Sequence, residues 1–132
     1  MAPNLRESGM IWYIAFGSAI GGVARYLMGG AIQRASGAAF PLGTFVINIT
    51  GSFLLGVLLH VAVHPPHLRP ELRAALTVGF CGGYTTFSTF SAETVTLLQQ
   101  GEWRRATLYV LGSVTLSLLA TAGGFMVGER WG

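Results

Sequence analysis

The chain has little charge and lacks two residue types altogether. Only 10% of its 132 residues are charged, none is lysine or aspartate, and 52% are hydrophobic. A phosphate-binding loop of the GxxxxGK type needs a lysine, and a paired-aspartate site needs two aspartates, so both kinds of site are excluded. This composition is far from that of a soluble domain and predicts an integral membrane protein.

Cysteine is almost absent as well, and the positive charges are scattered. Cys81 is alone, so no intramolecular disulfide or CxxC centre can form, and we interpret it as a small buried side chain. The net charge of +3 comes from arginines that stand singly, apart from the pair Arg104 and Arg105. Because they form no basic stripe, we expect no nucleic-acid partner.

What the chain does have is four long apolar segments. Each is near or above the ~20 residues that a helix needs to cross the hydrocarbon of a bilayer. Pro41, HPPHLRP (64–70) and QQGEWRR (99–105) separate them, and the three tryptophans lie at segment ends, where indoles favour the membrane interface. We predict an all-α integral membrane protein whose four transmembrane helices form a single domain over 1–132. The predicted spans are 10–33, 42–63, 72–98 and 105–128.

The arginines outside these segments do not specify an orientation. One side of the membrane would carry Arg6, Arg69, Arg73 and Arg130, and the other side would carry Arg34, Arg104 and Arg105. Since orientation follows the Lys/Arg bias of short loops, the same chain can insert both ways up.

Four short helices leave little room for both a pathway and its shell, and a dimer is the simple remedy. If its two copies lie antiparallel, a two-fold axis runs in the membrane plane. The spacings Gly17–Gly21 and Gly79–Gly83 would let helices approach closely, either between copies or within one subunit.

The third segment contains GFCGGYTTFSTF (79–90), which is a poor helix former at its centre. Gly82 and Gly83 are conformationally loose, and the β-branched threonines that follow lose side-chain freedom in a helix. We therefore expect the third helix to be broken mid-membrane, where freed carbonyls often coordinate ions. The alternative is a continuous helix whose glycines pack tightly on a neighbour.

Polar side chains recur at helical spacing in the neighbouring spans. Thr44, Asn48 and Ser52 are four residues apart in the second span. The same spacing relates Ser113, Ser117 and Thr121 in the fourth span. A mid-membrane amide is costly unless its donors and acceptor find partners, so Asn48 is either a bond between helices or a donor to an anion.

Charged and aromatic residues suggest the sign of a permeant ion. Arg25 lies well inside the first segment and is either functional or long enough to snorkel to the interface. Phe87 and Phe90 share a helix face, and a phenyl edge can face an anion favourably. Glu93 follows on the same side and either pairs structurally or marks an ion's exit. Such a lining suits a small anion and is compatible with fluoride, although composition and spacing do not single fluoride out.

Three motifs resemble the fluoride channels of the Fluc family, also called CrcB. GGYTTFSTFSAET (82–94) is similar to the third-helix signature of that family, GTFVINITG (43–51) to its second-helix asparagine motif, and GGVARY (21–26) to its first-helix arginine motif. The likeness covers essentially the whole chain, including its length and four-span layout.

The resemblance implies a dual-topology antiparallel homodimer with two pores that passes fluoride passively across a bacterial inner membrane. It implies a channel and no enzyme, so no residue is assigned a catalytic role. The residues that match pathway positions of the family are Asn48, Phe87, Phe90, Thr44, Ser88, Thr89, Glu93, Tyr109, Ser113, Ser117 and Thr121. Arg25 matches an arginine with a vestibule or structural role. Gly82 and Thr85 match positions whose main-chain carbonyls hold one structural sodium ion at the dimer axis.

Other functions have weaker support in the sequence. A small four-helix multidrug exporter shares the size and dual topology, but it needs a membrane-embedded carboxylate, and the first span offers only Arg25. A membrane metalloenzyme would use His60, His64 and His67, yet His67 follows two prolines and no carboxylate is near. We interpret these histidines as interfacial.

Overall fold

The computed structural model describes residues 2, 4–63 and 68–131, and these residues are helical with short connections. His64 and His67 lie outside the described residues. The elements in chain order are α1 (Leu5–Ser36), α2 (Leu42–Val63), α3 (Pro70–Ala74), the π-helix η1 (Ala75–Cys81), α4 (Gly82–Tyr84), α5 (Phe87–Gln99) and α6 (Trp103–Trp131).

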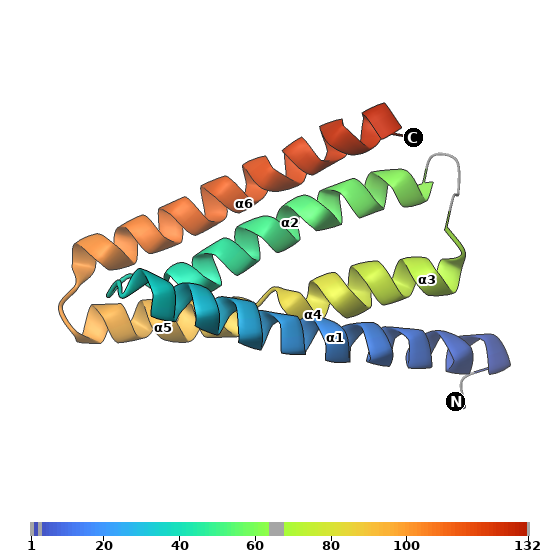
Figure 1. Cartoon of the computed structure of the whole chain (residues 1–132), viewed down its shortest axis with the longest axis horizontal. Helices are drawn as coiled ribbons and strands as arrows, with labels where there is room; N and C mark the ends of the chain where they lie inside the picture. The colour runs from blue at the N-terminus through green and yellow to red at the C-terminus, as the bar shows by residue number, and fades with distance from the viewer. Residues whose placement is uncertain (1, 3, 64–67, 132) are drawn as a thin grey trace.

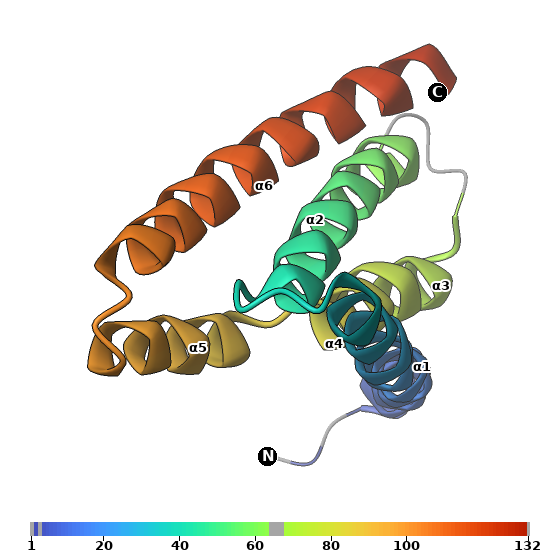
Figure 2. The same ribbon diagram turned by 60° about the vertical axis from the view of Figure 1, so that its left-hand side comes forward.

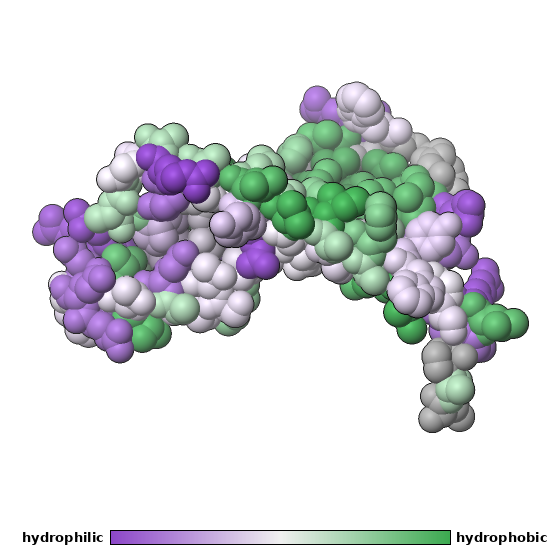
Figure 3. Space-filling view, turned by 60° about the horizontal axis from the view of Figure 1, so that its bottom comes forward, coloured by the Kyte–Doolittle hydropathy of each residue, from purple (hydrophilic) through white to green (hydrophobic). Residues whose placement is uncertain are grey.

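Three helices are long and apolar enough to cross a membrane, namely α1, α2 and α6. They run along the long axis of the molecule (Figure 1). Hydrophilic residues gather towards its two ends, and hydrophobic residues cover the middle of the face in Figure 3. A surface of this kind is expected where lipid, and not water, is the solvent.

Local signals set the ends of α1. The Asn4 side chain accepts a hydrogen bond from the Glu7 amide, and the Glu7 carboxylate accepts one from the Asn4 amide, which together form a capping box. At the other end Gly37 adopts a left-handed conformation, φ 57°, which glycine reaches without steric cost. The helix thus extends beyond the 10–33 segment at both ends.

The helices form two closely packed groups. α2 lies along α6, and α1 lies along α3, η1 and α4 (Figures 1 and 2). A Cβ added at Gly124 of α6 would lie 2.8 Å from the Val57 amide nitrogen of α2. Contact between backbones therefore requires glycine in this pair.

The second group uses the glycines at four-residue spacing. Added Cβ atoms at Gly79 and Gly83 would lie 2.8 Å from the Ile14 carbonyl oxygen and 2.7 Å from the Ser18 carbonyl oxygen, and Gly17 and Gly21 meet the same segment from α1. The sequence left open whether these glycines let helices approach between copies or within one chain. The structure shows the approach within one chain.

Residues 70–99 form several helical pieces. α3, η1 and α4 occupy one half of the molecule and α5 the other, with Thr85 and Thr86 extended between them (Figure 1). The stretch expected to interrupt the helix runs from Gly82 to Thr86. Its glycines are helical, with Gly82 at φ −64° and ψ −37°, and its threonines are extended. The helix ends after Tyr84, and Gly83 is held against α1.

Candidate functional site: two polar cavities joined at Thr86

Asn48 of α2 holds the extended link between α4 and α5. Its Nδ2 donates to the Thr86 carbonyl over 3.1 Å, and its Oδ1 accepts from the Thr86 amide over 2.8 Å. The amide thereby satisfies both backbone groups of a buried residue that a helix or strand would otherwise satisfy. Asn48 retains a second N–H, since a primary amide has two.

Thr86 also starts α5. Its side-chain oxygen accepts from the Thr89 amide over 3.1 Å, so Thr86 is the N-cap of the helix. The Thr86 hydroxyl also lies 3.0 Å from the Thr89 hydroxyl and 3.3 Å from the Ser88 hydroxyl. Three hydroxyl groups from one turn are thus gathered at the N-terminus of α5, where the helix dipole is positive.

A cavity of about 270 Å³ opens between α2, α5 and α6, and we call it the α2–α5–α6 cavity. Its polar lining combines the link with some of the polar residues that recur at helical spacing in the second and fourth predicted spans. Its apolar lining includes two phenylalanines. The lining residues are Asn48, Gly51, Ser52, Leu55, Thr85, Thr86, Phe87, Phe90, Ser113, Val114 and Ser117. None of these side chains carries a charge.

Ser113 is the unusual member of this lining. Its side chain is buried, with 6% of the residue exposed, and its Oγ has no hydrogen-bond partner in the part of the chain that the structure describes. A buried hydroxyl without a partner gives up its hydrogen bonds to water and forms none in their place, which costs about 1–3 kcal/mol. This cavity therefore contains a donor ready for a ligand.

The two phenylalanines lie together but differ in exposure. Their ring centroids are 5.7 Å apart, and the Phe90 centroid is 5.1 Å from that of the fully buried Tyr109. Phe90 is thus held in an aromatic cluster, whereas Phe87 is 79% exposed on the isolated subunit. The Phe87 ring is large and apolar and lies beside a polar cavity, and the described residues leave most of it uncovered.

Glu93 of α5 is bound from two helices. The Thr44 hydroxyl donates to its Oε1 over 2.8 Å, and the Tyr109 hydroxyl donates to its Oε2 over 2.6 Å. Each carboxylate oxygen therefore has a short, charge-assisted donor. These bonds connect α2, α5 and α6. Of the two roles predicted for Glu93, a structural pairing or an ion's exit, they support the structural pairing.

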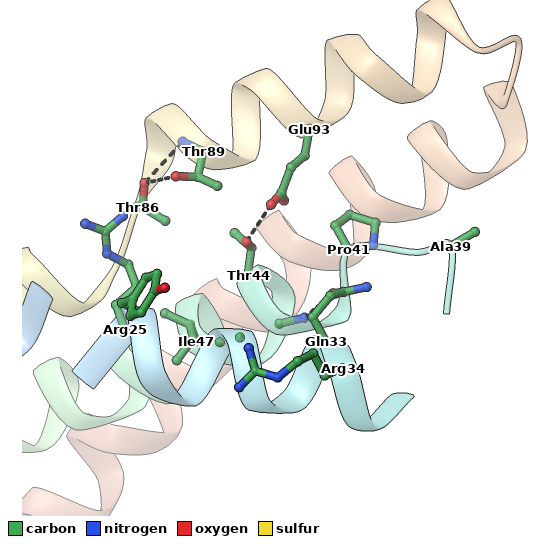
Figure 4. Close-up of a pocket in the computed structure, with 14 residues that line it drawn as sticks. Arg25, Gln33, Arg34, Ala39, Pro41, Thr44, Ile47, Thr86, Thr89 and Glu93 are labelled. Carbon is green, nitrogen blue, oxygen red and sulfur yellow. Dashed lines mark hydrogen bonds between the residues drawn. The ribbon is translucent and has the colours of Figure 1, made fainter. Parts of the chain in front are cut away.

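A second cavity, of about 480 Å³, contains the charged groups, and we call it the arginine cavity (Figure 4). The lining includes Arg25, Arg34, Thr44, Thr89 and Glu93. Thr86 lines this cavity as well as the other one. Thr86, which Asn48 holds, is thus the residue that the two linings share.

Arg25 joins α1 to the end of α4. Its Nε donates to the Gly83 carbonyl over 3.1 Å, and in Figure 4 its guanidinium lies beside Thr86. A cation at a helix C-terminus is stabilised by the exposed carbonyls there. Arg25 therefore has a structural bond and also lines the arginine cavity.

The remaining predicted residues are placed less centrally. The Thr121 hydroxyl donates to the Ser117 carbonyl over 3.0 Å and to the Ser52 carbonyl over 3.3 Å, and it lines neither cavity. Ser88 also lies outside both linings. No group of three His, Cys, Asp or Glu side chains suited to a metal occurs among the described residues, which include His60.

Backbone oxygens at the link are nevertheless available to a cation. The Thr86 amide donates to Asn48 and the Thr89 amide donates to the Thr86 side-chain oxygen, so neither amide has the carbonyl of Gly82 or Thr85 as its partner in these bonds. Backbone carbonyls supply oxygen without net charge, which suits a hard monovalent cation.

Sequence reasoning missed Thr86 and the connection from α1 to α2. Gln33 donates to the carbonyls of Ala38 and Phe40 and accepts from the Gly43 amide, which fixes the rim of the arginine cavity. A threonine, which is a residue type favoured at helix N-caps, directly before Phe87 was the signal available for Thr86. Nothing in the spacing pointed to Gln33.

Comparison with known proteins covers most of the chain. Residues 12–125 match the family described as "CrcB-like protein, Camphor Resistance (CrcB)". A protein of Geobacter sulfurreducens named "Fluoride-specific ion channel FluC" is 47% identical over 117 residues, which cover 89% of this chain and 94% of that protein.

Proteins of the same name from two other organisms are similarly close. The one from Acidobacterium capsulatum is 45% identical over 118 residues, covering 89% of this chain and 94% of its own length. The one from Hahella chejuensis is 45% identical over 112 residues, covering 85% and 88%. With a family match over 12–125 and three long apolar helices, the chain is a multi-pass membrane protein that belongs to the CrcB family.

Proposed function

We propose that the chain is a fluoride-selective ion channel that lets fluoride leave the cell passively and so protects the cell from its toxicity. Relatives more than 40% identical over most of both chains are named fluoride-specific ion channels. The single observation that carries the proposal is the buried, unpartnered Ser113 hydroxyl in a charge-free cavity beside the Asn48 amide.

The lining of the α2–α5–α6 cavity can replace the water around a small anion. Hydroxyls of Ser113 and Ser117 and the free N–H of Asn48 are donors, and donors at close quarters are what a strongly hydrated ion requires. The edges of Phe87 and Phe90 carry the positive part of the ring quadrupole and can face the same anion. A passive channel needs no covalent step, so no residue acts as a catalyst.

The arginine cavity provides the approach to that lining. Arg25 and Arg34 give it positive charge, while both Glu93 oxygens are occupied by donors from Thr44 and Tyr109. An anion attracted there meets the hydroxyls of Thr86 and Thr89 before it reaches the α2–α5–α6 cavity. Thr86 lines both cavities, which supports a continuous route past the link.

The working assembly is proposed to be an antiparallel homodimer with two pores in a bacterial inner membrane. Residues 70–99 would form the third of the four spans in chain order, with the Thr85–Thr86 link at mid-membrane depth, where irregular backbone must be buried by protein. The 79% exposed Phe87 ring supports this assembly, because a second copy would cover it and complete the pore lining.

A structural sodium ion is proposed at the axis of this dimer. The carbonyls of Gly82 and Thr85 would hold it, two from each copy. The ion would fix the link of one copy against that of the other. Its removal is expected to lower dimer stability and fluoride flux together.

The deciding experiment is efflux from liposomes that contain only the purified protein. A fluoride-selective electrode should record rapid fluoride release that needs neither ATP nor a proton gradient, and a chloride electrode should record far less under the same conditions. Release that saturates and depends on a proton gradient would instead indicate a coupled exporter. A small multidrug exporter remains the alternative, and proton-coupled efflux of cationic compounds without fluoride flux would favour it.

A further inference from the structure

An apolar groove of about 300 Å³ opens between α5 and α6, and we call it the Trp103 groove. Thr94 and Leu98 of α5 and Trp103, Thr107, Val110 and Leu111 of α6 line it. Both threonine hydroxyls bond to their own helices, Thr94 to the Phe90 carbonyl and Thr107 to the Trp103 carbonyl, each over 2.8 Å. Because both hydroxyls are already bonded, the groove presents methyl groups and hydrocarbon, and neither threonine offers a free donor.

The groove starts at the level of the lipid headgroups. α6 carries a tryptophan at each end, Trp103 and Trp131, and its 29 residues span about 43 Å, close to the full thickness of a bilayer. Trp103 is 67% exposed at the start of α6. Indoles at the ends of membrane helices favour the membrane–water interface. From Trp103 to Leu111 the groove descends about 12 Å into the hydrocarbon, at about 1.5 Å per residue.

Positive charge lies at the shallow end only. Arg104 and Arg105 follow Trp103 and are exposed, and Arg105 bonds Glu102 over 3.1 Å. Arg104 has no salt bridge in the described part of the chain. The amide groups at the start of α6 add partial positive charge, and arginine there is unfavourable for the helix itself. An anion bound above the groove would pair with Arg104 and would also offset the unfavourable interaction of arginine with the positive end of the α6 dipole.

We propose that the Trp103 groove is a binding site for an anionic phospholipid, with one acyl chain between α5 and α6 and the headgroup phosphate at Arg104. The shape and charge of the groove complement this ligand along its whole length, with hydrocarbon against hydrocarbon and phosphate against guanidinium. The cavities assigned to ion passage share no lining residue with it, so the lipid site is distinct from the proposed route.

Tryptophan quenching by brominated lipid tests the proposal. A Trp12→Phe, Trp131→Phe variant leaves Trp103 as the single indole, and fluoride efflux checks that it is folded. It is reconstituted in phosphatidylcholine with a minor fraction of phosphatidylglycerol. One or the other lipid is brominated in the acyl chain near the headgroup, since bromine quenches an indole only at contact range.

The expected result is a relative association constant for phosphatidylglycerol over phosphatidylcholine of about fivefold, the preference that one arginine near an anionic surface provides. Arg104→Gln should bring the ratio close to one. Arg130→Gln, at the opposite end of α6, should leave it unchanged. Equal quenching by the two lipids would overturn the proposal, as would the absence of quenching by either, which would mean that a second copy covers the groove.

Discussion

The Asn48 amide offers the sharpest perturbation of the proposed pathway. Asn48→Asp keeps the shape of the side chain and the bond from the Thr86 amide, but it removes the donor to the Thr86 carbonyl and adds a negative charge to the cavity lining. An anion about 5 Å from that charge, at an effective dielectric constant of about 20, is opposed by roughly 3 kcal/mol. Fluoride flux should therefore fall by about two orders of magnitude.

The assay is fluoride efflux from liposomes, measured with an ion-selective electrode at equal protein density. The chain provides a matched control, because its only other asparagine, Asn4, caps α1 at an exposed position, and aspartate is an equally good cap. Asn4→Asp should keep wild-type flux. Wild-type flux in Asn48→Asp, or an equal loss in both variants, would refute the placement of Asn48 on the route.

Three further substitutions test other parts of the structure. Phe90→Ile removes the ring edge from the cavity lining, so fluoride efflux should fall at least tenfold while the elution volume in size-exclusion chromatography stays that of the wild type; unchanged efflux would mean that the ring does not face the ion. Gly124→Ala places a Cβ 2.8 Å from the Val57 amide nitrogen and should destabilise the fold by about 1–3 kcal/mol in thermal unfolding. Its neighbour Gly123 has nothing within 4 Å, so Gly123→Ala should be neutral or slightly stabilising, and equal losses would contradict the helix contact. Tyr84→Phe breaks the 2.9 Å hydroxyl contact with Thr50 and should cost about 0.5–1.5 kcal/mol in the same measurement.

Hydrophobic runs predicted the long helices well, because burial in lipid is a property of the segment itself. α2 has the bounds that the sequence indicated, 42–63, and α1 and α6 extend beyond theirs into capped or tryptophan-rich ends. The same reasoning placed Asn48 and Ser52 on one side of the second span and Ser113 and Ser117 on one side of the fourth, and these four residues line one cavity. Thr44 and Thr121 have the same spacing but do not line it, so spacing alone did not fix the lining.

Long-range partners were the part that spacing could not provide. Asn48 and Thr86 are 38 residues apart, and Thr44 and Glu93 are 49 apart, so only the packing of α2 against the link and α5 brings them together. The sequence indicated an interruption between Gly82 and Thr86 but not which residues would carry it. Gly83 is pressed against the α1 backbone and is helical, while Thr85 and Thr86 are extended.

The π-helix from Ala75 to Cys81 gives this stretch a tolerance to a change in length that a regular helix lacks. A π turn contains an additional residue relative to an α turn, so deletion of one residue here would let the segment relax into an ordinary α-helix. Later side chains would keep nearly the same direction around the axis, so Gly83 would stay against Ser18 and Thr86 would stay in register with Asn48. A one-residue deletion within the regular helix α5 would instead rotate every later side chain by about 100°, at ~3.6 residues per turn. A frame-preserving codon loss should therefore be better tolerated within 75–81, away from the packed Gly79, than within α5.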